Sequence, residues 1–140
     1  MFWQARQTAC SIALPMKRLL IVDNEPTIVF ALKRYFMRKG FAVDCAAELE
    51  EAEALVTHTP YDLVIADLCL TANGSTEGLE IIRYVRSISR CGARLILLTG
   101  YGTPAVEREA YRRGADAFLQ KPRPLAEIAN VAARLTGATA

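Results

Sequence analysis

Short, continuous apolar runs alternate with segments of helical periodicity from Lys17 onward, and this alternation constrains the fold more than any other feature. Parallel strands are buried on both faces, so they are almost uniformly apolar, and a crossover helix usually joins one to the next. The pattern therefore predicts βα units around a parallel sheet. Five strands are expected, at residues 19–22, 41–45, 63–66, 94–98 and 117–119.

The first predicted helix has clear signals at both ends. It is expected to start at the cluster Asn24, Glu25 and Pro26, where Asn can cap the helix and Pro fits its first turn. Lys39 and Gly40 close it, because a cation suits the carboxyl end of a helix and glycine suits the turn that follows. Amphipathic helices are also predicted after the second, third and fifth strands.

The predicted helix at residues 104–113 has the thinnest apolar face. Only Val106 and Ala110 clearly lie on one side of it before Gly114 ends the helix. Because few apolar contacts would anchor this segment, we expect it to be a candidate for movement.

Right-handed crossovers between five parallel strands give an α/β fold with helices on both faces of an open sheet. We expect a flavodoxin-like, doubly wound, five-stranded parallel sheet of order 2-1-3-4-5. With 140 residues and 52% apolar side chains, one domain can build its core without disulfides or a structural metal. Residues 17–137 are expected to form that domain, after a loose N-terminal extension at residues 1–16, with no output domain.

The charge balance points to no polyanionic partner. There are 17 Lys and Arg residues against 15 Asp and Glu residues, so we expect no nucleic acid and no membrane as partner. No apolar run approaches the ~20 residues that span a bilayer. The four cysteines form no CxxC pair, and His58 is the only histidine, which argues against a zinc site. We expect a cytoplasmic protein with reduced thiols.

Polar side chains follow four of the predicted strands, namely Asp23, Asp67, Thr99 and Lys121. Ligands of open α/β sheets bind outside the carboxyl ends of the strands, at the point where strands one and three are neighbours. Asp23 and Asp67 should therefore converge. Two such carboxylates repel each other unless a cation lies between them, and oxygen ligands suit Mg²⁺.

The same crevice holds groups suited to a phosphoryl ligand. Asn24 or Glu25 would add a further oxygen to the metal site, and the Thr99 hydroxyl and Lys121 ammonium are donors for phosphoryl oxygens. A carboxylate can itself be the nucleophile in phosphoryl transfer, and it then forms an aspartyl phosphate. Asp67, on the central third strand, is the candidate nucleophile.

Five motifs give the chain a family resemblance. They are VDNEP at residues 22–26, IAD ending at Asp67, EGLE at 77–80, LLTGYG at 97–102 and KP at 121–122. Together they resemble the receiver (CheY-like) domain of two-component response regulators over about residues 17–137. The resemblance implies these roles: Asp67 as phosphoacceptor; Asp23, Asp67 and the Cys69 backbone carbonyl as Mg²⁺ ligands; Thr99 as switch hydroxyl; Lys121 as phosphoryl contact; and Phe118 as rotating switch aromatic. It also implies a cis Lys121–Pro122 bond.

The resemblance implies a signalling function rather than an enzyme with a separate substrate. Asp67 would take a phosphoryl group from a phosphohistidine donor in a Mg²⁺-dependent reaction, and self-dephosphorylation would remove it. The implied partners are a sensor histidine kinase or histidine phosphotransfer protein and a downstream protein target. The domain is expected to be a monomer or weak dimer.

Two departures from the family pattern leave an alternative open. Asn24 stands where the family usually has a second acid, and the loop after Asp67 is about three residues longer than usual, with Thr71 in place of the typical Pro. The alternative is a receiver-like interaction module that works without phosphorylation. The presence of Asp67, Thr99 and Lys121 favours the phosphorylation-dependent function over this alternative. A flavin-binding flavodoxin is disfavoured, because acidic residues follow the first strand where a phosphate cradle would lie.

Overall fold

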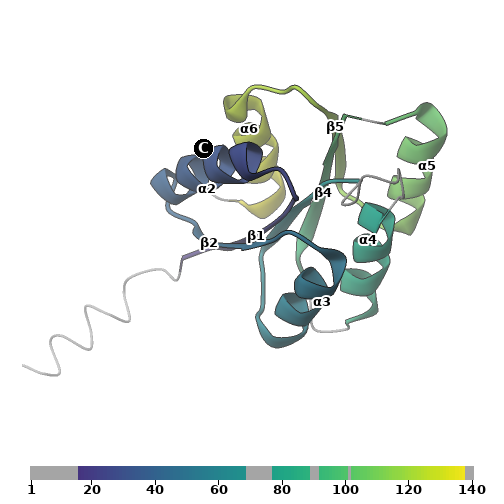
Figure 1. Cartoon of the computed structure of the whole chain (residues 1–140), viewed down its shortest axis with the longest axis horizontal. Helices are drawn as coiled ribbons and strands as arrows, with labels where there is room; N and C mark the ends of the chain where they lie inside the picture. Colours follow the sequence, from purple (N-terminus) through teal and green to yellow (C-terminus); the bar gives the residue numbers. More distant parts are fainter. Residues whose placement is uncertain (1–15, 69–76, 89–91, 101, 138–140) are drawn as a thin grey trace, which may run out of the picture.

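The computed structural model describes residues 16–68, 77–88, 92–100 and 102–137, which form a three-layer α/β fold (Figure 1). A parallel sheet of five strands has the order β2-β1-β3-β4-β5, so the predicted doubly wound topology is confirmed. The elements are β1 (Arg18–Val22), α2 (Pro26–Arg38), β2 (Ala42–Ala46), α3 (Leu49–His58), β3 (Leu63–Ala66), α4 (Glu77–Ser87), β4 (Arg94–Thr99), α5 (Pro104–Arg113), β5 (Ala117–Gln120) and α6 (Leu125–Thr136).

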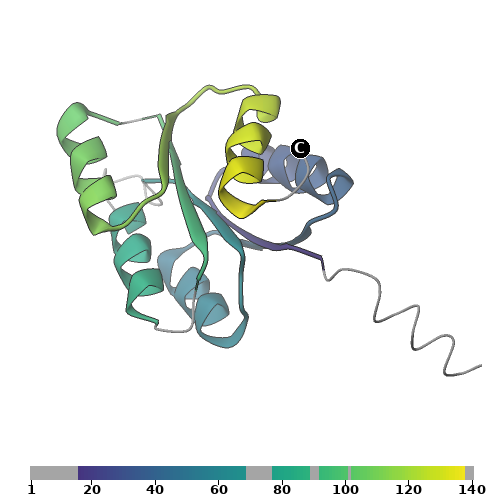
Figure 2. The same cartoon turned by 180° about the vertical axis from the view of Figure 1, so that it is seen from behind.

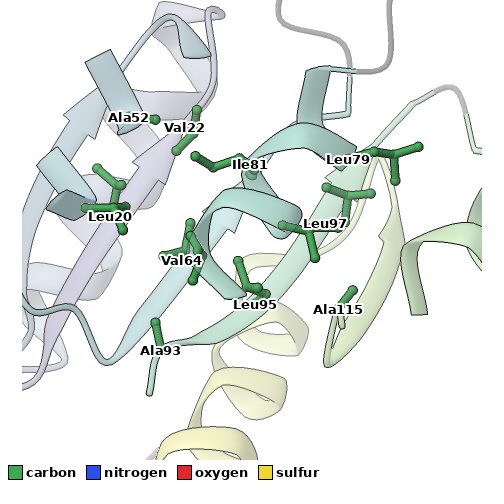
Figure 3. Close-up of a cluster of buried hydrophobic side chains, with 14 of the residues drawn as sticks. Leu20, Val22, Ala52, Val64, Leu79, Ile81, Ala93, Leu95, Leu97 and Ala115 are labelled. Carbon is green, nitrogen blue, oxygen red and sulfur yellow. The ribbon is translucent and has the colours of Figure 1, made fainter. Parts of the chain in front are cut away.

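Helices cover both faces of the sheet, as Figures 1 and 2 show from opposite sides. Helices α2 and α6 lie on one face, and α3, α4 and α5 lie on the other. Side chains alternate along each strand, so Leu19 and Ile21 of β1 pack under α2 and α6, whereas Leu20 and Val22 pack under α3 and α4. Figure 3 shows the cluster on the α3 and α4 side of the sheet, in which residues of β1, β3 and β4 pack against Ile81 of α4.

The start of the first helix differs from its prediction. Glu25, not Asn24, is the N-cap residue of α2, and the Glu25 side chain makes no capping hydrogen bond. Two local features place the boundary there: Pro26 occupies the first turn, and Asp23 Oδ1 accepts the Glu25 N–H at 2.9 Å. The carboxyl end follows its prediction, since Gly40 adopts the left-handed backbone that glycine favours, at φ +95°.

Several predicted details lie within one residue of the structure or outside the described residues. The second strand runs over Ala42–Ala46, and Phe41 packs in the core just before it. Helix α5 is as thinly anchored as predicted, with Ala110 as its one buried residue. The N-terminal extension is predicted at residues 1–16, and all but Met16 lie outside the described residues, as do Cys69 and Thr71. Within the described ranges, no helix is both long and apolar enough to cross a membrane.

The core of the α2 face yields a stability prediction. Phe36 is 0% exposed and its ring meets Phe41 edge to face, at 5.3 Å between centroids. Phe36→Ala is expected to lower the free energy of unfolding by about 3–5 kcal/mol, because it leaves a cavity between α2 and the sheet. Phe30→Ala is the matched control on the same helix, where the ring is 62% exposed, and should cost less than about 1 kcal/mol. Urea denaturation measures both values, and equal losses would contradict this account of the core.

Candidate functional site

Strand pairing brings the two predicted aspartates together. Val22 of β1 is in register with Ala66 of β3, so Asp23 and Asp67 leave the sheet side by side at its carboxyl edge. The Asp67 N–H donates to the Val22 carbonyl at 2.8 Å and extends the ladder by one residue. Both side chains are nearly buried, with 4% of Asp23 and 5% of Asp67 exposed.

Lys121 reaches this acidic pair from the far end of the chain. The Lys121–Pro122 peptide bond is cis, as the resemblance implied, and the Lys121 N–H donates to the Thr99 carbonyl at 2.8 Å. The ammonium nitrogen lies 3.0 Å from Asp23 Oδ2 and 3.4 Å from Asp67 Oδ2. It also lies 3.1 Å from Glu25 Oε1. One cation therefore contacts three carboxylates.

The charges around Lys121 favour its protonated form. Burial of the ammonium acts to lower the pKa of Lys121, but the hydrogen bond and charge of Asp23, the charge of Asp67 and the hydrogen bond to Glu25 outweigh it. The net effect is that the pKa of Lys121 lies above its usual value. The site therefore holds a fixed positive charge beside the Asp67 carboxylate.

The donor set fits a hard divalent cation. Asp23, Glu25 and Asp67 each offer one carboxylate oxygen, and these oxygens lie within 4.8 Å of one another. Mg²⁺ prefers oxygen ligands and often uses only one or two carboxylates with water. The sequence left Asn24 and Glu25 open as the source of a further oxygen. Among the described residues, Glu25 joins the acidic cluster, and Asn24 lies on the surface beside it.

The two predicted switch residues, Thr99 and Phe118, lie on β4 and β5, which are paired with each other. Thr99 ends β4 and is fully buried, and Phe118 lies in β5 with 8% of its surface exposed. A Cβ at Gly102 would lie 2.6 Å from the Phe118 ring atoms Cε1 and Cζ. The ring is therefore seated directly against the backbone of residue 102. Sequence reasoning included Gly102 in a motif but missed this contact.

His58 lies away from these groups. It ends α3, which returns the chain to the start of β3, so it belongs to the amino edge of the sheet. Its side chain is exposed. The His58 imidazole is therefore on the opposite edge of the sheet from Asp23, Asp67 and Lys121.

Gly78 shapes the site without contributing a functional group. It is the second residue of α4, and its N–H donates to the Leu68 carbonyl at 2.9 Å. A Cβ at this position would overlap the Asp67 carbonyl oxygen and lie 2.7 Å from Leu68 Cα. The first turn of α4 therefore packs directly on the backbone that presents Asp67. The EGLE motif pointed to this residue, but the close approach that requires glycine depends on the fold.

A substitution at Gly78 tests this packing. Gly78→Ala is expected to lower the free energy of unfolding by about 1–3 kcal/mol, because neither backbone segment can retreat without breaking strand or helix contacts. Gly92→Ala is the control, since a Cβ there meets nothing within 4 Å. It should leave stability unchanged or slightly raised. Thermal or urea denaturation compares the two, and an unchanged Gly78→Ala protein would show that α4 can shift freely.

Comparisons with known proteins identify the family of this chain. The sequence model described as "Response regulator receiver domain" matches residues 19–133. The acid tolerance regulatory protein ActR of Sinorhizobium medicae is 36% identical over 114 residues, which are 81% of this chain and 57% of the relative. The chain thus spans little more than half the length of that relative.

Two solved structures share the fold. A response regulator from Burkholderia pseudomallei, solved with a phosphorylated aspartic acid, calcium ion and citrate, is 31% identical, with a TM-score of 0.73 over 82% of this chain and 65% of that one. A CheY-like receiver domain from Methanospirillum hungatei is 25% identical, with a TM-score of 0.78 over 89% of this chain and 97% of that one. The chain belongs to the receiver domain family of two-component response regulators.

Proposed function

We propose that Asp67 accepts a phosphoryl group from a phosphohistidine donor in a Mg²⁺-dependent reaction, and that this modification switches a protein-interaction surface. The observation that carries the proposal is the Lys121 ammonium, held 3.4 Å from Asp67 Oδ2 by two further carboxylates. A carboxylate oxygen of Asp67 forms the new bond to phosphorus. The bond from phosphorus to the donor imidazole nitrogen breaks, and that nitrogen keeps the electron pair.

Each residue of the site has a part in this reaction. Lys121 places positive charge where the phosphoryl oxygens gather, and Thr99 offers its hydroxyl to one of them. Asp23 and Asp67 would hold Mg²⁺, with the Cys69 backbone carbonyl as a further ligand by family resemblance and Glu25 as a third acid. Bound Mg²⁺ would supply positive charge that neutralises the transferred group. In the Burkholderia pseudomallei relative, a phosphorylated aspartic acid and a calcium ion occur in one structure.

The conformational change would extend from the phosphorylated Asp67 to α5. A phosphoryl group adds negative charge and acceptor oxygens, so it draws the Thr99 hydroxyl inward and leaves space beside β4. Phe118 then rotates into this space. The ring already touches Gly102, just ahead of α5, so the rotation reaches the most thinly anchored helix. The surface formed by α5, β5 and α6 would report the change to a partner.

The partners follow from the proposed chemistry. A sensor histidine kinase or histidine phosphotransfer protein would supply the phosphoryl group, and a downstream protein would bind the switched surface. We propose residues 17–137 as the receiver domain, as a monomer or weak dimer without separate enzymatic turnover. Its balanced charge gives no reason to propose nucleic acid contacts for the domain itself.

The alternative function is interaction without phosphorylation, and Asn24 is its main support. The second acid of the family pattern is absent at this position. However, Glu25 lies with Asp23 and Asp67 in one cluster, so the site still has three carboxylates. This observation favours the metal-dependent function.

Phosphorylation of Asp67 is the first test. Incubation with acetyl phosphate and Mg²⁺ is expected to add the mass of one phosphoryl group to the intact protein. Asp67→Asn should remove the gain, because an amide oxygen is a poor nucleophile, and a metal chelator should suppress it in the original protein. Intact-mass spectrometry gives the result. A protein that gains no mass under these conditions would favour the phosphorylation-independent alternative.

Metal binding tests the roles of Asn24 and Glu25. Asn24→Asp is expected to tighten Mg²⁺ binding about tenfold, or ~1.4 kcal/mol, because it adds a carboxylate within a Debye length of the cation. Glu25→Gln should weaken binding by a similar factor. Glu53→Gln, in the second turn of α3 and further from the carboxyl edge of the sheet, is the matched control and should have no effect. Isothermal titration calorimetry measures the three affinities, and an Asn24→Asp protein that binds no more tightly would contradict this charge argument.

A further inference from the structure

Arg86 of α4 joins three elements that are distant in sequence. Its Nη1 donates to the Ala93 carbonyl at 2.7 Å, ahead of β4. Its Nη2 donates to the Gly114 carbonyl at 2.7 Å and to Asp116 Oδ2 at 2.8 Å, and its Nε donates to the Gly114 carbonyl at 3.1 Å. A planar guanidinium with these partners has little freedom to move. Arg86 therefore fixes the turn between α5 and β5 to α4.

Further contacts hold the same end of α5. Ala110 is fully buried, and Gly114 has a φ of +114°, where a Cβ would lie 3.0 Å from Arg86 Nε. Arg113 Nη1 lies 3.4 Å from Glu80 Oε1 of α4. The Tyr111 hydroxyl oxygen accepts the backbone N–H of Phe118 at 3.1 Å. The carboxyl-terminal half of α5 is thus tied to both α4 and β5.

The amino-terminal half of α5 has fewer ties. Thr103 Oγ1 accepts the Val106 N–H at 3.2 Å, a bond within the helix itself. Val106 is the partly buried apolar residue of this half. Gln120 Nε2 donates to the Gly102 carbonyl at 3.2 Å in an exposed position. Across the described part of the chain, no ion pair joins residues 103–108 to another element.

We propose that α5 is a lever that pivots at its carboxyl-terminal end, with Arg86 as the positioning residue that fixes the pivot. The signalling part rests on the proposed function: rotation of Phe118 would act on Gly102 and displace the amino-terminal half, while Gly114 stays fixed to α4. Figures 1 and 2 show α5 beside α4 at the outer side of the sheet. The switched surface would then centre on residues 102–108, and Arg86 would limit how far the change spreads.

We call the bonds from Arg86 to Ala93, Gly114 and Asp116 the clamp. It can be tested without phosphorylation. Arg86→Met keeps an apolar stem but removes every donor, so amide hydrogen exchange in residues 111–116 is expected to rise at least about tenfold. Arg83→Met is the matched control on α4, because Arg83 pairs with Glu80 of the same helix. It should leave exchange in residues 111–116 unchanged. Arg86→Lys, which keeps one charge but not the fork, should give an intermediate rise and serves if Arg86→Met does not fold. Unchanged exchange in residues 111–116 of the Arg86 variants would overturn the clamp.

The pivot is tested with beryllofluoride and Mg²⁺, which mimic the phosphoryl group. Exchange is expected to change in residues 102–108 and to stay constant in residues 111–116 of the original protein. In the folded Arg86 variant, the change should extend to residues 111–116. Equal changes along the whole helix of the original protein would overturn the pivot. If beryllofluoride and Mg²⁺ change amide exchange neither in α5 nor near Asp67, the proposed function fails. The exchange of the Arg86 variants without beryllofluoride still decides whether Arg86 holds the end of α5.

Discussion

Two buried carboxylates side by side are the constraint on which the rest of this structure depends. Adjacent β1 and β3 place Asp23 and Asp67 together, and their mutual repulsion and desolvation would oppose folding without a nearby cation. Lys121 provides that cation from a position 98 residues after Asp23. The chain must therefore form β5, at the far edge of the sheet, before Lys121 can offset part of this negative charge.

Much of this arrangement is visible in the sequence because it repeats one local pattern. Buried parallel strands such as Leu63–Ala66 are continuously apolar, and the polar residue after each run marks the carboxyl edge of the sheet. Topology then brings Asp23, Asp67 and Lys121 together without knowledge of side-chain contacts. The fold and the centre of the site follow from patterns of this kind.

The parts that the sequence could not supply depend on short distances between distant segments. Asn24 and Glu25 were both candidates for a further oxygen, and the sequence alone does not show that a Glu25 carboxylate oxygen lies within 4.8 Å of those of Asp23 and Asp67. The sequence alone does not show why Gly78 and Gly102 must be glycine. In the fold, Gly78 packs against the Asp67 carbonyl and Gly102 packs against the Phe118 ring. Arg86 has no sequence motif, because its partners are mostly backbone carbonyls whose positions only the fold defines.

The bond between Tyr111 and the Phe118 backbone also bears on how molecules of this protein meet one another. β5 is an edge strand, and an unpaired main-chain donor at such an edge is a template for a strand from a second molecule. The tyrosine hydroxyl takes up this donor and lies over the edge at the middle of the strand. A neighbouring chain cannot continue the sheet through residue 118 while the phenol is in place, so the ring protects the domain against edge-to-edge aggregation.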